Sequence, residues 1–254
     1  MAHSGHYTGA SWSAQTIMTS RLVLCLGDLF IPDRANFKKL LTPGKIGQIL
    51  CLGNLTSPSV YTFLRNLAPD LQLVKGDFDI SLSTPAPPNP NAAYAAPTDQ
   101  VPVPTALSKV VTHGGLRIGF THGHTIVPPG DPDSLLIAAR QMDVDVLCWG
   151  GTCKFEAYEM EGKFFVNPGS ATGAVSWSPD AELDSEGEAV STPSFVLMDV
   201  SRHASWANLV DLSDHPEQVQ GDVLVLYVYQ LRKDQNGVEN VAVEKVSYRK
   251  NASS

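Results

Sequence analysis

Hydrophobic positions in this chain fall into short runs separated by glycine, proline and polar residues. Several early runs are apolar at every position rather than at alternate ones, which is typical of strands covered on both faces. These runs span residues 21–26, 47–52, 71–74, 116–121 and 145–148. Ser57-Pro58 and Asp131-Pro132 each join an N-capping residue to a proline at the first helical position, so they predict helices that end near residues 68 and 142.

The final third of the chain reads as strands alone. The predicted strands span residues 195–200, 223–231 and 238–248. His113-Gly114-Gly115 and Glu161-Gly162 are each flanked by strand-like runs, and they predict tight hairpins. Units of strand and helix followed by antiparallel strands indicate an α/β fold in which two packed mixed sheets are flanked by helices.

Three segments interrupt this pattern. Residues 84–105 hold seven of the 18 prolines, residues 176–192 are acidic and rich in small residues, and residues 203–221 form a weaker third case. Strand-like runs resume after each segment, so we interpret all three as loop insertions in a single domain spanning residues 21–250. Residues 1–20 lack the apolar stretch of a signal peptide and are expected to form a mobile polar tail.

Net charge, the length of the apolar runs and the spacing of the cysteines limit the kinds of partner and compartment expected for this chain. A net charge of −8 argues against binding to nucleic acid or to anionic lipid, both of which favour basic surfaces. No apolar run approaches the roughly 20 residues that span a bilayer. The four cysteines show no pairing motif, which favours a cytoplasmic protein without disulfides.

Polar residues follow five of the apolar runs, each next to a glycine. These ends are Gly27-Asp28-Leu29-Phe30, Gly53-Asn54, Gly76-Asp77-Phe78-Asp79, His122-Gly123-His124 and Trp149-Gly150-Gly151-Thr152-Cys153. In α/β sheets, ligands bind beyond the carboxyl ends of the strands, and glycine there lets the backbone turn tightly. The five ends together predict one shared site.

The series resembles the motifs of the calcineurin-like metallophosphoesterases. The runs LVLCLGDL, GDFD, KFEAYE, NPGSATGA and PSFVLMD, within residues 21–250, resemble more narrowly the small scaffold subunits of retromer, a vacuolar protein sorting complex. The resemblance implies a metallophosphoesterase-like α-β-β-α sandwich. Asn167-Pro168-Gly169-Ser170 reads either as an anion-binding loop or as a tight turn closing the base of the site.

The resemblance implies seven metal-ligand positions, and the chain keeps a possible ligand at only some of them. Ligand positions remain at Asp28, Asn54, Asp77 and His122, although Asn54 lacks the charge of the family's bridging aspartate. Histidine positions are replaced by Phe30, Gly151 and Cys153. We therefore expect no cofactor, with at most one weakly bound divalent cation, and no catalysis.

Other interpretations of these residues stay open. The Asp and Asn side chains could instead bond nearby backbone N–H groups, and His122 could be a buried hydrogen-bonded histidine. A divergent metal-dependent phosphoesterase with His124 as its acid or base is the alternative function, and a structural metal-binding protein is a third.

The resemblance also implies two binding surfaces. The first would bind the α-solenoid large subunit of retromer through Val127, with Ile126, Pro128 and Phe30 as neighbours. The second is a hydrophobic patch for regulatory proteins at Leu22, Leu197, Tyr229 and Val243, which could equally be core residues. The function implied is that of a non-catalytic scaffold in endosome-to-Golgi and recycling transport, cytoplasmic and peripheral on endosomes through its partners.

Overall fold

The structure of the protein is a computed structural model that describes residues 22–29, 40–79, 101, 103–174, 192–202, 222–233 and 238–250. The predicted tail and Phe30 lie outside the described residues. The predicted insertion at 203–221 does too, and so do most of those at 84–105 and 176–192.

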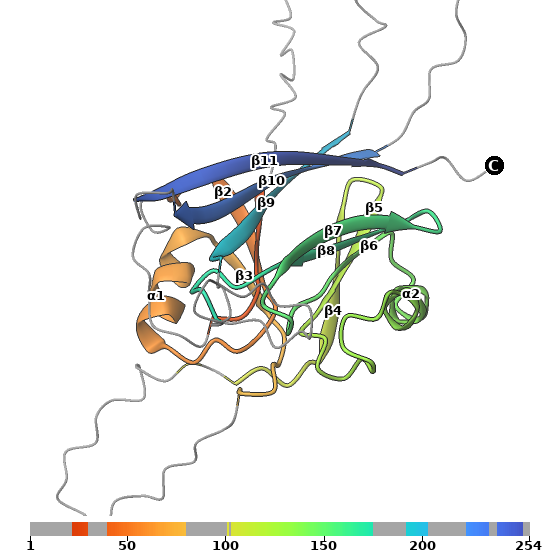
Figure 1. Ribbon diagram of the computed structural model, residues 1–254, viewed down its shortest axis with the longest axis horizontal. Helices are drawn as coiled ribbons and strands as arrows, with labels where there is room; N and C mark the ends of the chain where they lie inside the picture. The colour runs from red at the N-terminus through yellow and green to blue at the C-terminus, as the bar shows by residue number, and fades with distance from the viewer. Residues whose placement is uncertain are drawn as a thin grey trace, which may run out of the picture.

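Two mixed sheets pack face to face (Figure 1). The six-stranded sheet has the order β11-β10-β9-β1-β2-β3, and the five-stranded sheet has the order β4-β5-β6-β8-β7. The first sheet contains β1 (Leu22–Leu26), β2 (Ile46–Cys51), β3 (Asp70–Leu73), β9 (Ser194–Arg202), β10 (Asp222–Lys233) and β11 (Glu239–Arg249). The second contains β4 (Ser108–His113), β5 (Leu116–Thr121), β6 (Val146–Cys148), β7 (Phe155–Met160) and β8 (Lys163–Pro168).

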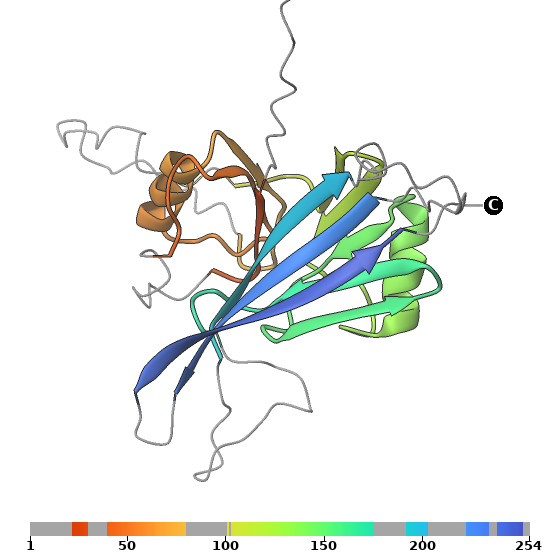
Figure 2. The same ribbon diagram turned by 90° about the horizontal axis from the view of Figure 1, so that it is seen from above.

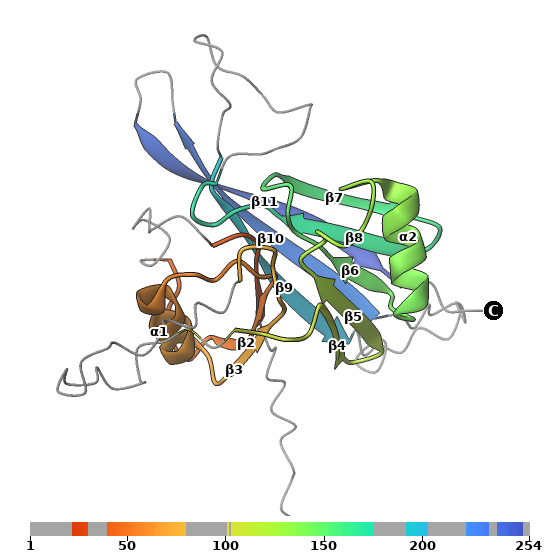
Figure 3. The ribbon, with the colours of Figure 1, turned by 90° about the horizontal axis from the view of Figure 1, so that it is seen from below.

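Helices cover the outer faces of this sandwich (Figures 2 and 3). α1 (Pro58–Leu67) packs on the six-stranded sheet, and α2 (Pro132–Gln141) packs on the five-stranded sheet. Strand β1 shows why its run is apolar throughout, because Val23 faces the other sheet whereas Leu24 faces α1. The predicted α-β-β-α architecture is confirmed.

The two helices begin where the sequence predicts, but their caps differ. The Asp131 carboxylate accepts a hydrogen bond from the backbone N–H of Ser134 at 2.8 Å, as expected of an N-cap. Ser57 occupies the N-cap position of α1 without bonding the helix backbone, and its Oγ lies 3.0 Å from Ser59 Oγ instead. Ser57 is therefore the N-cap residue that the sequence predicts, but its side chain makes no capping hydrogen bond. Neither helix that the structure describes is long and apolar enough to cross a membrane.

Both predicted hairpins are present. His113 pairs with Leu116 across the first turn, and Met160 pairs with Lys163 across the second. In the second turn Glu161 and Gly162 have φ values of 49° and 71°, the left-handed pair that a two-residue turn between twisted strands favours.

Candidate functional site

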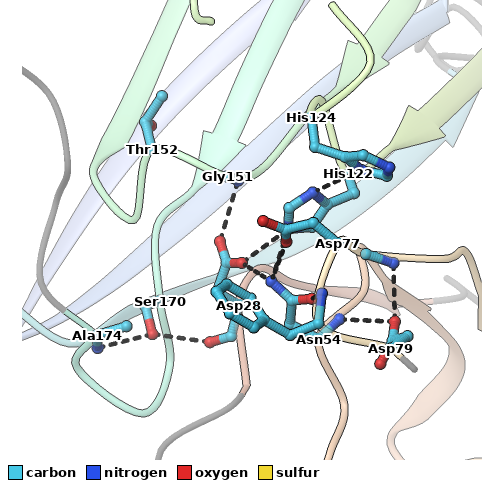
Figure 4. A network of polar contacts seen from close by, with 12 residues as sticks. Asp28, Asn54, Asp77, Asp79, His122, His124, Gly151, Thr152, Ser170 and Ala174 are labelled. Carbon is cyan, nitrogen blue, oxygen red and sulfur yellow. Dashed lines mark hydrogen bonds and ion pairs between the residues drawn. The ribbon is translucent and has the colours of Figure 1, made fainter. Parts of the chain in front are cut away.

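The polar residues at the strand ends meet at one edge of the sandwich, as the sequence predicts (Figure 4). Asp28 follows β1, Asn54 follows β2 and His122 follows β5, while Asp77 comes from the loop after β3. Three of these side chains are buried, with exposed fractions of 1% for Asp28, 1% for Asn54 and 2% for His122. Asp77 lies at the surface of the group, with 46% of its side chain exposed.

The amide of Asn54 lies at the centre of this group. Its Nδ2 is 2.8 Å from Asp28 Oδ1, 3.0 Å from Asp77 Oδ1 and 2.9 Å from His122 Nε2. Its Oδ1 accepts a hydrogen bond from the backbone N–H of Phe78 at 2.9 Å. Because the oxygen is bound in this way, the amide presents its two N–H groups, rather than a metal-binding oxygen, to the acidic residues.

Asp28 and His122 form a buried ion pair, with Oδ1 and Nε2 2.8 Å apart. Burial alone would raise the pKa of Asp28, but hydrogen bonds from His122, Gly151 and Asn54 and the charge of His122 lower it. Burial disfavours the imidazolium, yet the hydrogen bond and charge of Asp28, with Asp77 and Asp79, raise the pKa of His122. Both shifts favour the charged forms, so His122 donates its Nε2–H to Asp28.

The second nitrogen of His122 lies against another histidine. Nδ1 of His122 is 3.0 Å from Nδ1 of His124. Burial and the neighbouring charge of His122 lower the pKa of His124, which favours the neutral form of that ring. His124 is exposed and ends the network on its solvent side.

Asp79 supports the site through backbone hydrogen bonds, a role that the sequence analysis did not assign to it. Its Oδ2 accepts hydrogen bonds from the backbone N–H groups of Asn54 at 2.9 Å and Gly76 at 2.8 Å, and the residue is 6% exposed. A Cβ on Gly76 would lie 2.2 Å from Asn54 Oδ1, so only glycine lets the two loops approach this closely. The signal available was the second acid of the GDFD run.

The loop Asn167–Ser170 closes the base of the site by holding backbone. Ser170 Oγ donates to the carbonyl oxygen of Asp28 at 2.7 Å and accepts from the N–H of Ala174 at 3.0 Å. A Cβ on Gly27 would lie 1.8 Å from the carbonyl oxygen of Gly169, so β1 and this loop are in direct contact. Of the two interpretations, these contacts favour the tight turn over the anion-binding loop.

Gly151 and Cys153, which the sequence analysis aligned with two histidine ligands of the family, provide no free donor atom suited to a cation. The backbone N–H of Gly151 donates to Asp28 Oδ2 at 3.0 Å, occupying a carboxylate oxygen. Cys153 is 6% exposed, and burial together with the charge of Asp28 raises the pKa of its thiol, which keeps it protonated.

These residues do not fit a centre of two metal ions. Such a centre needs several anionic or nitrogen donors around two cations and a bridging oxygen. Here an amide NH₂ group, a backbone N–H and Nε2 of His122 point at the Asp28 carboxylate instead. In the part of the chain that the structure describes, no group of three or more His, Cys, Asp or Glu side chains is arranged to hold a metal ion.

The first predicted binding surface is the loop of residues 125–129, which leaves the network at His124. Val127 is 76% exposed and Pro128 is exposed, as an interface residue of the free protein must be. Ile126 packs half-buried against the cluster beneath α2 and supports the loop from inside, so its part in the predicted surface stays a prediction. Ser134 Oγ donates to the Val127 carbonyl at 3.0 Å and ties the loop to α2.

The four residues of the second predicted surface lie on four adjacent strands. Leu22, Leu197, Tyr229 and Val243 occupy β1, β9, β10 and β11 on the face of the sheet that carries α1. Val243 is 52% exposed and the other three are half-buried. The Tyr229 ring stacks on Phe195, with ring centroids 4.7 Å apart. Tyr227, which pairs with Leu197, belongs to the same surface and was missed.

The comparisons with known proteins agree with this geometry. The family of calcineurin-like phosphoesterase superfamily domains matches residues 32–201. The chain is 44% identical over 234 residues to vacuolar protein sorting-associated protein 29 of Schizosaccharomyces pombe, which covers 90% of this chain and 98% of that protein. The crystal structure of Chaetomium thermophilum Vps29 is 46% identical with a TM-score of 0.65, covering 90% of this chain and 98% of that one. The same Vps29 with a cyclic peptide is 45% identical with a TM-score of 0.64, covering 92% and 99%.

Fold, site and family match together define a calcineurin-like phosphoesterase superfamily protein. Within that superfamily, the identity to Vps29 proteins over nearly their whole length is decisive. The chain belongs to the Vps29 family of vacuolar protein sorting proteins.

Proposed function

We propose that this chain, a retromer sorting subunit by its membership of the Vps29 family, acts as a scaffold that does not hydrolyse phosphate esters. It binds the α-solenoid large subunit through the 125–129 loop and carries no physiological metal. It reaches endosomal membranes through its partners rather than by its own contacts with lipid.

The observation that carries this proposal is the hydrogen-bonded network at Asn54. In-line attack on a phosphate needs an activated water and cations that neutralise the phosphoryl oxygens. In this site the Asp28 carboxylate is already bonded to Asn54, His122 and Gly151. A carboxylate satisfied by three internal donors has little capacity left for a cation.

The exposure of the 125–129 loop supports its role in binding. Val127 has 76% of its surface in solvent, and the next two residues, Pro128 and Pro129, are exposed too. Adjacent exposed apolar residues of this kind can mark a binding site. Hydrogen bonds from Ser134 to Val127 and from Ile126 to Gly123 hold the loop against the body. A loop that is already ordered loses little conformational entropy on binding.

The test replaces one exposed valine at a time by aspartate. Val127→Asp buries an unpaired charge at the proposed interface and should weaken large-subunit binding by at least about a hundredfold, since such burial costs several kcal/mol. Val243→Asp makes the same change at a second exposed valine, on β11, and should leave that affinity unchanged. Titration calorimetry measures both. Equal affinity of Val127→Asp and the unmodified chain would refute the placement.

The same pair of variants addresses the second surface. Regulatory proteins that bind at Tyr229 and Val243 should be lost with Val243→Asp and kept with Val127→Asp. Loss of both kinds of partner from one variant with an unchanged melting temperature would show that the two surfaces are not separate.

A further inference from the structure

Strand β11 forms one edge of the six-stranded sheet. It pairs with β10 over all eleven of its residues, from Glu239 to Arg249, and within the described residues no strand pairs with its other side. The edge is long, and Figure 2 shows β11 as the outermost strand of its sheet, crossing above the five-stranded sheet. An edge of this kind presents a row of backbone N–H and C=O groups that another strand can pair with.

The residues of β11 carry a self-complementary pattern on the sheet face that bears α1. In order along this face stand Glu239, Val241, Val243 and Lys245, all exposed, with fractions of 36% and 52% for the two valines. When a second copy of the strand lies antiparallel to the first, this order can place the acid of each copy opposite the base of the other, and valine opposite valine.

We propose that β11 is the site at which two copies of this chain associate, side by side and antiparallel, about a two-fold axis at Ala242. This register sets Val241 opposite Val243 of the second copy, and Glu239 opposite its Lys245. By symmetry each pair occurs twice, so the contact contains two ion pairs and two valine pairs. Opposite charges and β-branched residues directly across an antiparallel pair stabilise it.

Two other registers of the same strand pair place fewer valines directly across from each other, and each contains an unfavourable pair. An axis at Val243 sets Val241 opposite Lys245, which pairs an apolar side chain with a charge. An axis at Glu244 sets the two Glu244 carboxylates opposite each other, although it brings Glu239 opposite Arg249. In the Ala242 register Glu244 faces the neutral Asn240, and it keeps its ion pair with Arg232, 2.6 Å away in the same chain.

The experiment uses the purified full chain and charge-reversed variants, with sedimentation equilibrium at physiological salt as the measurement. The unmodified chain should show a reversible monomer–dimer equilibrium. Lys245→Glu and Glu239→Lys each turn both ion pairs into repulsive pairs, and each should weaken the dimer at least about tenfold. An equimolar mixture of these two variants should restore the affinity, because every cross-strand pair is then attractive again.

Arg249→Glu is the matched control, since it makes the same charge change on the same strand outside the pairs of this register. It should leave the dimer unchanged, whereas the Glu244 register requires it to weaken the dimer. A chain that stays monomeric at every concentration would overturn the proposal. So would a dimer that Lys245→Glu leaves intact, or variants whose mixture gains nothing. Melting temperatures of the variants confirm that each is folded.

Discussion

Replacing Asp28 by alanine tests whether the old metal site is now a structural element. Asp28 Oδ1 accepts hydrogen bonds from Asn54 Nδ2 and His122 Nε2, both at 2.8 Å, and Oδ2 accepts one from the N–H of Gly151 at 3.0 Å. Asp28→Ala leaves these buried donors without their acceptor and leaves the charge of His122 without its partner. Removing one member of a buried ion pair costs about 3–5 kcal/mol.

The expected change is readily measured. For a chain of this size each kcal/mol of lost stability lowers Tm by about 2–4 °C, so Asp28→Ala should lower it by about 6–20 °C. Urea unfolding followed by circular dichroism, in buffer with a chelator, gives the free energy directly. Asp77→Ala is the control, because it deletes a carboxylate of the same group whose side chain is 46% exposed, and it should cost no more than about 1 kcal/mol.

A vacant metal cage would behave in the opposite way. Carboxylates held together for a cation repel one another when it is absent, so removing one would leave the stability unchanged or raise it. An Asp28→Ala variant as stable as the unmodified chain in chelator would therefore refute the view that hydrogen bonds have replaced the metal.

Three further outcomes follow from the structure. Purified protein with added Mn²⁺ or Zn²⁺ should neither hydrolyse an aryl phosphate nor gain in Tm, and turnover abolished by Asp28→Ala would restore the enzyme as an interpretation. All four cysteines are buried, and burial raises the pKa of Cys51 to about 12. A thiol reagent should thus modify none of them until the protein unfolds, and rapid reaction of one in the native state would contradict this. Burial raises the pKa of Glu156 against the smaller effect of Lys154, so its charged form destabilises the fold. Glu156→Gln should therefore stabilise the protein at neutral pH, the gain should disappear as pH falls to the unfolded pKa of about 4.3, and a gain that persists in acid would show another cause.

The sequence was sufficient to predict the layers of the fold. Val23 and Leu24 show why, because a strand with apolar residues on both sides needs cover on both sides, and one sheet and one helix supply it. The glycines before Asp28 and Asn54 likewise predicted that the strand ends converge. These patterns encode burial and backbone conformation, which are properties of neighbouring residues along the chain.

The details of the network could not be predicted in this way. The orientation of the Asn54 amide depends on the backbone N–H of Phe78, which comes from another loop 24 residues away. Asp79 looked like any loop acid until the fold placed it beneath two N–H groups. Ile126 and Val127 are similar in chemistry, and only packing against α2 decides which of them faces inward. Contacts between distant segments decide each of these points.

Asp28 has a structural role that does not require a bound metal ion. Its carboxylate joins the ends of β2, β5 and β6 through Asn54, His122 and Gly151, while its carbonyl is bonded by Ser170 after β8. One residue therefore connects both sheets at the edge from which the 125–129 loop emerges. Any replacement that lost the negative charge would leave His122 buried without its partner, so the aspartate has a structural role at this position. The same contacts keep the base of the loop in place, so internal hydrogen bonds support the surface proposed for the large subunit.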